Sequence, residues 1–263
     1  MPDPRRKRRW RLLRVGPRNG AENMARDIAL MRRARDSGET VFSIYEWATP
    51  TLSFGRNQTA LGLYNREALA DRRVNVVRRP TGGRALLHHR EVTYSVTAPV
   101  DQSETLQTSY ERINRILLDG LTRLSVGATI ANPSSTAKPP TDLPCFAEPS
   151  KGELVSNGRK LVGSAQWRDS GALLQHGSIL IEDDQPMIRL FSVFPENEEI
   201  PGAATLSEAL GRTPDVDEVA DAMFDSVRSR EDPDALTLDE GEIKAATREQ
   251  VGYFENELWT WRR

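Results

Sequence analysis

The sequence predicts an α/β (α+β) fold, in which a β-sheet packs against helices. Two patterns carry that prediction: three strand-like runs joined by tight turns between residues 153 and 181, and one amphipathic helix between residues 104 and 124. A chain of 263 residues is long enough to bury a full hydrophobic core, either as one large domain or as a domain of about 200 residues with an appendage.

The first part of the chain alternates between helix and strand patterns. The basic segment 1–9 has no apolar run after it and is expected to be a disordered tail. From Asn23, apolar residues recur at helical spacing until Gly38, which stands where a helix stop is expected. Runs rich in β-branched and aromatic residues predict strands at 41–47, 51–55 and 74–79, and residues 63–73 are typical of a short helix.

The block RRPTGGRALLHH, residues 78–89, joins a predicted strand to the strand EVTYSVT through a tight glycine turn. Two adjacent glycines let the backbone take positive φ and approach a ligand closely, and their N–H groups can form an anion-binding nest. Arg79 and Arg84 could add charge-assisted hydrogen bonds, although an ordinary hairpin turn with solvated arginines is the alternative that Gly-Gly alone favours. His88 and His89 are adjacent on a strand and point to opposite faces, so they are not expected to bind one metal ion.

The helix at 104–124 is the clearest in the sequence and is assigned to core packing, because six apolar residues form one stripe at spacings of three and four. A short strand near 128–131 and a Pro/Ser/Thr-rich surface loop at 132–144 follow it. Asn157-Gly158 is a strong hairpin signal, and it predicts a three-stranded antiparallel meander that carries Lys160 and His176. The C-terminal part is expected to be helical at 185–194, 215–227 and 242–263.

The only cysteine, Cys145, lies at a loop-to-strand junction rather than inside an apolar run. A lone cysteine is usually a small buried hydrophobe. However, Lys160 follows on the meander, and a lysine ammonium beside a thiol favours the thiolate, which is the nucleophile. The alternative for Lys160 is a solvent-facing residue after a β-turn. His176 is expected to be a hydrogen-bonded wall of a pocket rather than a general base.

Composition excludes several classes of protein. The chain has 36 basic and 38 acidic residues, so its net charge does not favour a nucleic-acid or membrane partner. One cysteine cannot form an internal disulfide, and no apolar stretch is long enough to span a bilayer. The expected compartment is therefore the cytoplasm.

Several motifs occur together and in order: NMARD from Asn23, RRPTGGRALLHHREVTYSV, CFAEPS with Glu153, GRKLVGSAQWR and LQHGSILI. In this combination the chain resembles the biotin/lipoate protein ligase superfamily, and within it most resembles the LipM-type octanoyltransferases of lipoate assembly. The resemblance implies a mixed sheet flanked by helices. It also implies a catalytic domain over residues 10–204 and a small helical extension over 205–263 packed on the same domain.

The resemblance further implies transfer of an octanoyl group from octanoyl-acyl carrier protein to a lysine of a lipoyl domain or of the glycine cleavage H protein. Cys145 matches the acyl-accepting cysteine of the family, and Lys160 matches its active-site lysine. No cofactor and no metal are implied, and a monomer is expected. The residues expected to bind substrate are Arg79, Thr81, Gly82, Gly83, Arg84, His89, Gly163, Ser164, Ala165 and His176.

Two positions depart from the family pattern. Ile28 follows Asp27 where relatives usually carry an acidic residue, and the glycine block reads GGR where lipoate ligases tend to have a third glycine. The missing glycine leaves less room for an adenylate phosphate, which favours a transferase. The alternatives are an ATP-dependent lipoate or biotin ligase, a lipoyl amidotransferase between lipoyl domains, and a non-catalytic binding module. The arginines near the glycine block are expected to form a docking patch for acidic partners.

Overall fold

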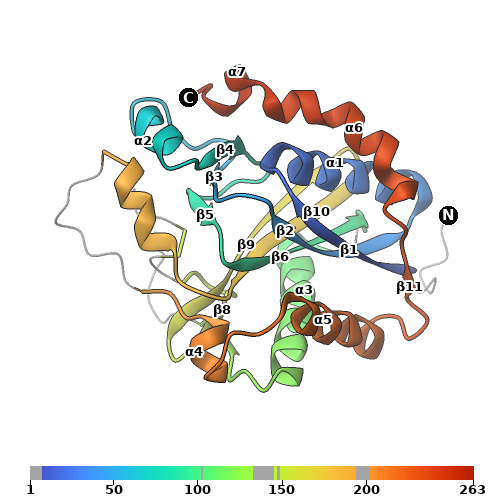
Figure 1. The fold of residues 1–263 in the computed structure, drawn as a ribbon. Coiled ribbons are helices and arrows are strands. Elements are labelled where there is room, and N and C mark those ends of the chain that lie inside the picture. Colours follow the sequence, from blue (N-terminus) through green and yellow to red (C-terminus); the bar gives the residue numbers. More distant parts are fainter. Residues whose placement is uncertain (1–7, 102, 133–144, 147–148, 194–201) are drawn as a thin grey trace.

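A mixed eight-stranded sheet runs through the centre of the protein, and a mixed sheet flanked by helices is what the resemblance implied (Figure 1). The structure is a computed structural model, and it describes residues 8–101, 103–132, 145–146, 149–193 and 202–263. The strand order is β11-β1-β2-β6-β10-β9-β8-β7, with β1 parallel to both β2 and β11 and the other neighbours antiparallel. The strands of this sheet are β1 (Trp10–Arg18), β2 (Thr40–Trp47), β6 (Glu91–Pro99), β7 (Thr129–Ile130), β8 (Leu154–Ser156), β9 (Arg159–Asp169), β10 (Ala172–Leu180) and β11 (Leu236–Thr237).

A second, three-stranded sheet has the order β4-β3-β5, and it carries the glycine block on the connection between β4 and β5. Its strands are β3 (Thr51–Phe54), β4 (Asn75–Arg78) and β5 (Leu86–His88). The strand β5 was not predicted as separate from the following strand. The small sheet has its own apolar cluster around Phe54 and Tyr64, and Trp261 near the C-terminus packs against that cluster.

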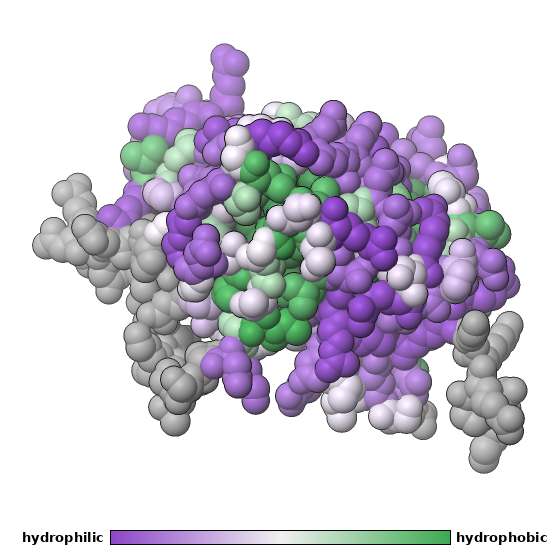
Figure 2. Space-filling view, turned by 90° about the horizontal axis from the view of Figure 1, so that it is seen from below, coloured by the Kyte–Doolittle hydropathy of each residue, from purple (hydrophilic) through white to green (hydrophobic). Residues whose placement is uncertain are grey.

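Helices cover both faces of the large sheet (Figure 1). One face carries α1 (Gly20–Ser37) and α6 (Gly241–Glu255), and the opposite face carries α3 (Leu106–Arg123) and α5 (Val216–Arg230). Seen from the α3 and α5 side, the described surface is hydrophilic over much of its area, with a hydrophobic area near the middle (Figure 2). The remaining short helices are α2 (Arg66–Asp71), the 3-10 helix η1 (Gln185–Phe191), α4 (Leu206–Leu210) and α7 (Glu257–Thr260).

The C-terminal residues are part of the same hydrophobic core as the sheet. Met223 and Val227 of α5 lie in one apolar cluster with Trp10 and Phe42. Trp259 lies in the cluster beneath α1, with Leu13. No described helix has the length and apolar character needed to cross a bilayer.

The predicted meander is confirmed in both strands and turns. β8, β9 and β10 pair antiparallel in sequence order, and Asn157 and Gly158 have φ of 50° and 75°. The second turn repeats this geometry at Ser170 and Gly171, with φ of 46° and 81°. Left-handed φ at both central positions matches the right-handed twist of the strands.

Two features at the N-terminus were predicted wrongly or not at all. The strand β1 was missed. The first helix begins at Gly20 rather than Asn23, because Asn19 caps it: its side chain accepts from the Glu22 N–H, and the Glu22 carboxylate accepts from the Asn19 N–H. The N-x-x-E spacing of this capping box was a readable signal. The predicted loop 132–144 lies outside the described residues.

Candidate active site

Cys145 lies directly beside Lys160 in the folded chain. Lys160 Nζ is 3.5 Å from Cys145 Sγ and donates to the Cys145 carbonyl oxygen at 2.8 Å. The same nitrogen donates to Glu153 Oε1 at 2.7 Å, and both side chains of this ion pair are less than a tenth exposed. Because the Glu153 carboxylate offsets the lysine charge, the cation can be buried here next to the sulfur.

One hairpin and one backbone hydrogen bond hold this group in place. Lys160 follows the Asn157-Gly158 turn on β9, and Glu153 precedes β8 on the other side of the same hairpin. The Cys145 N–H donates to the Ala85 carbonyl at 3.0 Å, which ties the cysteine to the segment leading into β5. The nucleophile candidate is therefore positioned between the glycine block and the meander.

Cys145 lines a narrow cavity. Its total empty space is about 430 Å³ when its open mouth is counted, but only about 40 Å³ is left for the centres of water molecules. It is therefore tight, and an eight-carbon chain has to displace side chains such as the flexible Met24. The cavity is lined by Met24, Tyr45, Trp47, Arg79, Gly83, Leu86, His88, Thr93, Cys145, Gly163, Ser164, Ala165, His176 and Gly177.

Two glycines keep the neighbourhood of Cys145 clear. A Cβ on Gly163 would lie 2.9 Å from a ring carbon of Phe146, whose ring centroid is 5.1 Å from Lys160 Nζ. A Cβ on Gly177 would lie 2.2 Å from the Gly163 carbonyl oxygen. Both positions therefore require glycine so that β9, β10 and Phe146 can pack together beside the thiol.

His176 is held on both ring nitrogens. Nε2 is 2.6 Å from the Thr81 hydroxyl, and Nδ1 is 2.8 Å from Asp27 Oδ2, which also accepts from the Tyr45 hydroxyl at 3.1 Å. With both nitrogens engaged, His176 fits a wall of the cavity better than a base for the thiol. Thr81 lies behind this histidine and does not line the cavity.

The neighbouring histidines have different partners, and His88, not the expected His89, lines the cavity. His88 stacks on Trp47 with ring centroids 3.9 Å apart, and its Nδ1 is 2.8 Å from Glu91 Oε1. Burial lowers the pKa of His88, although Glu91 opposes the shift. His89 is the first residue after β5 and does not line the cavity; its Nδ1 is 3.0 Å from Asp184 Oδ2.

The guanidinium of Arg79 is fully hydrogen-bonded to the glycine turn and to Ser53. Its guanidinium donates to the carbonyls of Gly82 and Arg84 and to both the carbonyl and the hydroxyl oxygen of Ser53, at 2.8–3.2 Å. These bonds use its five donors, so Arg79 fixes the turn rather than offering hydrogen bonds to a substrate. Burial lowers the pKa of Arg79. Gly82 and Arg84 do not line the cavity, whereas Gly83 does, with φ of 99°.

A polar network runs along the side of β9 that faces α3. The Ser164 and Tyr94 hydroxyls are 2.6 Å apart, and Tyr94 accepts from Gln175 at 2.9 Å. Burial raises the pKa of Tyr94, and burial, with the charge of Glu153 added to it, raises the pKa of Tyr110 to about 12. Both phenols therefore stay neutral at ordinary pH, and Tyr94 holds the strand that carries Ser164.

Several residues of the site were not assigned from the sequence. Asp27 and Glu153 were noticed only as parts of motifs, and their roles appear once His176 and Lys160 are seen beside them. The apolar residues that line the cavity from β2, such as Tyr45 and Trp47, gave no signal beyond strand propensity. Among the described residues, no group of three or more His, Cys, Asp and Glu side chains could hold a metal ion.

A thiol beside a buried lysine, on the wall of a narrow and largely apolar cavity, is an arrangement that suits an enzyme of acyl groups. Residues 19–228 match the family model of the lipoyl protein ligase A/B catalytic domain. The chain is 36% identical to "Octanoyltransferase LipM" of Kyrpidia tusciae, over 97% of this chain and 99% of the relative. It is 39% identical to "Octanoyltransferase LipM" of Bacillus subtilis, over 72% and 70% of the two chains. The chain belongs to the lipoyl protein ligase A/B catalytic domain family and, within it, to the LipM octanoyltransferases.

Solved structures share the fold at lower identity. A lipoate-protein ligase A bound with ATP superposes with a TM-score of 0.77 at 20% identity, covering 97% of this chain and 98% of the other. A bi-partite lipoate protein ligase from Thermoplasma acidophilum gives 0.75 at 20% identity, covering 97% and 96%. Since ligases align over nearly their whole length, the size of this chain does not separate a transferase from a ligase.

Proposed function

We propose that this octanoyltransferase works through a thioester on Cys145, with octanoyl-acyl carrier protein as donor and a lysine of a lipoyl domain or of the glycine cleavage H protein as acceptor. The contact between Cys145 Sγ and Lys160 Nζ, 3.5 Å long, carries the proposal. It brings a nucleophile and a cation together beside the narrow cavity that Cys145 lines. The expected monomeric state and cytoplasmic location remain parts of this proposal.

In the first half-reaction the Cys145 sulfur attacks the carbonyl of the octanoyl thioester. A carbon–sulfur bond forms to Cys145, the bond to the carrier's pantetheine sulfur breaks, and the proton lost by the Cys145 thiol ends on the departing thiol. The Lys160 side chain is in contact with the sulfur, and Glu153 is hydrogen-bonded to Lys160. Exchange of one thioester for another is nearly balanced in free energy, so the acyl group is stored at little cost.

In the second half-reaction the acceptor amine attacks the Cys145 thioester. A carbon–nitrogen bond forms, the bond to Cys145 breaks, and a proton of the amine ends on the released thiol. Each step develops negative charge on the carbonyl oxygen, and in this proposal Lys160, 3.5 Å from the sulfur, stabilises that charge. Amide formation from a thioester is downhill, so this step commits the acyl group to the acceptor.

The cavity walls supply selectivity for the acyl chain. Burial of each CH₂ is worth about 0.8 kcal/mol, so several methylenes give several kcal/mol of binding. Because Met24, Tyr45, Trp47 and Leu86 enclose the cavity, longer chains have to displace more buried side chains than an octanoyl chain does.

Intact-protein mass spectrometry tests the proposal. The purified protein is incubated with octanoyl-acyl carrier protein without ATP, beside Cys145→Ser. A hydroxylamine-sensitive octanoyl adduct is expected on the wild type and none on the variant. If the wild type forms no adduct, and transfer from free octanoate appears only with ATP, the reaction is that of a ligase and Cys145 is an ordinary small hydrophobe.

A further inference from the structure

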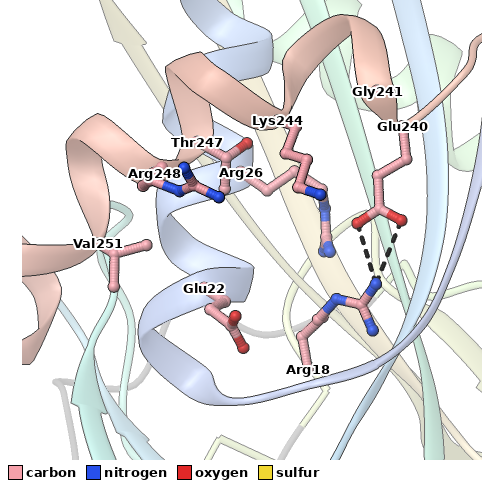
Figure 3. Close-up of a pocket in the computed structure, with 9 residues that line it drawn as sticks. All are labelled: Arg18, Glu22, Arg26, Glu240, Gly241, Lys244, Thr247, Arg248 and Val251. Carbon is pink, nitrogen blue, oxygen red and sulfur yellow. Dashed lines mark hydrogen bonds and ion pairs between the residues drawn. The ribbon is translucent and has the colours of Figure 1, made fainter.

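A second cavity, separate from the acyl site, lies between α1 and α6 (Figure 3). It leaves about 460 Å³ for the centres of water molecules, far more than the cavity at Cys145. Its charged lining consists of Arg18, Glu22, Arg26, Glu240, Lys244 and Arg248. No residue of the acyl site is among them, so the second cavity needs its own explanation.

The positive charges in this cavity are only partly matched. The Nη2 nitrogen of Arg18 donates to both carboxylate oxygens of Glu240, at 3.2 and 3.3 Å. The Glu22 carboxylate accepts the Asn19 N–H in the capping box of α1. For Arg26, Lys244 and Arg248, by contrast, the described part of the chain supplies no ion pair within 4 Å. Three cations therefore face a space whose two carboxylates are already engaged.

Arg26 is the most unusual of these groups, because its side chain is charged and only 2% of the residue is exposed. Its Nε and Nη2 are buried and have no hydrogen-bond partner among the described residues. The guanidinium lies over the Tyr45 ring, 4.0 Å from the centroid, and extends from α1 into the cavity (Figure 3). A buried charge is normally paired and hydrogen-bonded, so this site has a place for an anion.

The hydroxyl of Thr247 supplies a further polar group. Its Oγ1 is also buried and without a partner in the described structure, and it lies on α6 between Lys244 and Arg248. A planar guanidinium fork, two flexible cations and a hydroxyl suit a tetrahedral anion with several oxygens better than a single carboxylate.

We propose that the cavity between α1 and α6 binds a phosphate group. Arg26 anchors it from α1, and Lys244, Thr247 and Arg248 contact it from α6. The chemistry is that of a phosphate dianion, carried either by inorganic phosphate or by a phosphomonoester on a small metabolite. Binding links α1 to α6 across the cavity and does not depend on the acyl reaction.

Thermal unfolding and calorimetric titration of the full chain test this proposal in phosphate-free buffer at constant ionic strength. Inorganic phosphate, adenosine monophosphate and acetate are added separately. At roughly ten times the dissociation constant, phosphate is expected to raise Tm by about 3–5 °C. Tighter binding of adenosine monophosphate than of inorganic phosphate assigns a phosphomonoester, and the reverse assigns the free ion. An equal response to acetate overturns the proposal.

Three variants locate the site. Arg26→Gln is expected to weaken phosphate binding at least tenfold. Arg72 is an exposed arginine that caps the C-terminus of α2, outside the cavity, so Arg72→Gln is the control and is expected to bind as the wild type does. Lys244→Glu offers Arg26 a carboxylate from within the chain, so it is expected to abolish the phosphate response and to keep the protein folded. Retention of the full response in both Arg26→Gln and Lys244→Glu contradicts the assignment.

Discussion

Substitutions in the ion pair between Lys160 and Glu153 can distinguish the contribution of Lys160 to catalysis from its contribution to stability. Lys160→Met leaves the Glu153 carboxylate buried without its cation, and removal of one partner of a buried pair costs about 3–5 kcal/mol. For a chain of this size that corresponds to a fall in Tm of roughly 6–20 °C. The same change removes the cation beside Cys145, and loss of one group that stabilises an oxyanion slows the chemical step by about 10²–10³.

The double variant Glu153→Gln with Lys160→Met distinguishes the two effects. The glutamine oxygen still accepts from the Ser150 N–H, which the carboxylate does at 2.7 Å, and no buried charge remains. Stability is therefore expected to return to within about 1–2 kcal/mol of the wild type, while acyl loading stays slow by about 10²–10³. Urea unfolding measures the stability, and single-turnover octanoylation followed by intact mass measures the loading.

Lys151→Met is the matched control, because Lys151 is an exposed lysine on the same segment and its loss is expected to change neither quantity. Recovery of fast acyl loading in the double variant would refute the reasoning. Lys160 would then serve only to neutralise the buried charge of Glu153, and another group would have to stabilise the oxyanion.

Three further predictions follow from the site. Gly163→Ala forces the new Cβ against the Phe146 ring, so it is expected to destabilise the protein by about 1–3 kcal/mol and to slow acyl loading. Urea unfolding measures the first effect and a loading assay the second. Wild-type values for both would contradict the packing of Gly163 against Phe146. Burial lowers the pKa of folded His88 from its ordinary value of 6.5, so the unfolded chain binds a proton first and the stability of the protein falls as pH drops below about 6.5. His88→Gln should make the urea midpoint depend less on pH between about 7.5 and 5. An unchanged pH dependence in the variant would contradict this role of His88. Arg84→Glu should slow loading from acyl carrier protein more at low salt than at high salt, whereas an equal effect at both would remove the proposed docking patch.

The sequence predicts the meander well because its signals are local. Asn157-Gly158 needs only its own φ values to specify the turn, and the two strands it joins then place Lys160 across from β8. The partner of Lys160 could not be found in the same way. Glu153 lies just before the neighbouring strand, and the pairing register shifts between Leu154 and Val155, so simple alternation does not place it.

The strand β1 and the cavity residues were missed for a different reason. β1 is followed in sequence by α1 but pairs with β2 and β11, so its place depends on contacts over more than 200 residues. Whether a strand residue such as Tyr45 faces a cavity or a filled core depends on what packs above it, and strand propensity carries no such information. Non-local packing therefore sets the limits of prediction here, more than weak local signals do.

The glycine block shows how a functional motif can be explained by the fold itself. A Cβ on Gly83 would lie 2.7 Å from Arg79 Nη2, and a Cβ on Gly55 would lie 1.9 Å from the Gly83 carbonyl oxygen. Arg79 uses all its donors on this turn and on Ser53, so the turn is rigid before any ligand arrives. Because Arg79 keeps no donor for a phosphate while the turn is intact, the turn favours the proposed thioester donor over a nucleotide bound by Arg79. An ATP-dependent reaction that used Arg79 at this site would require its guanidinium to release Gly82 and Ser53. Lysine has a single ammonium and cannot replace the planar guanidinium that holds the turn. Arg79→Lys is therefore expected to impair turn geometry and stability before it impairs nucleotide binding.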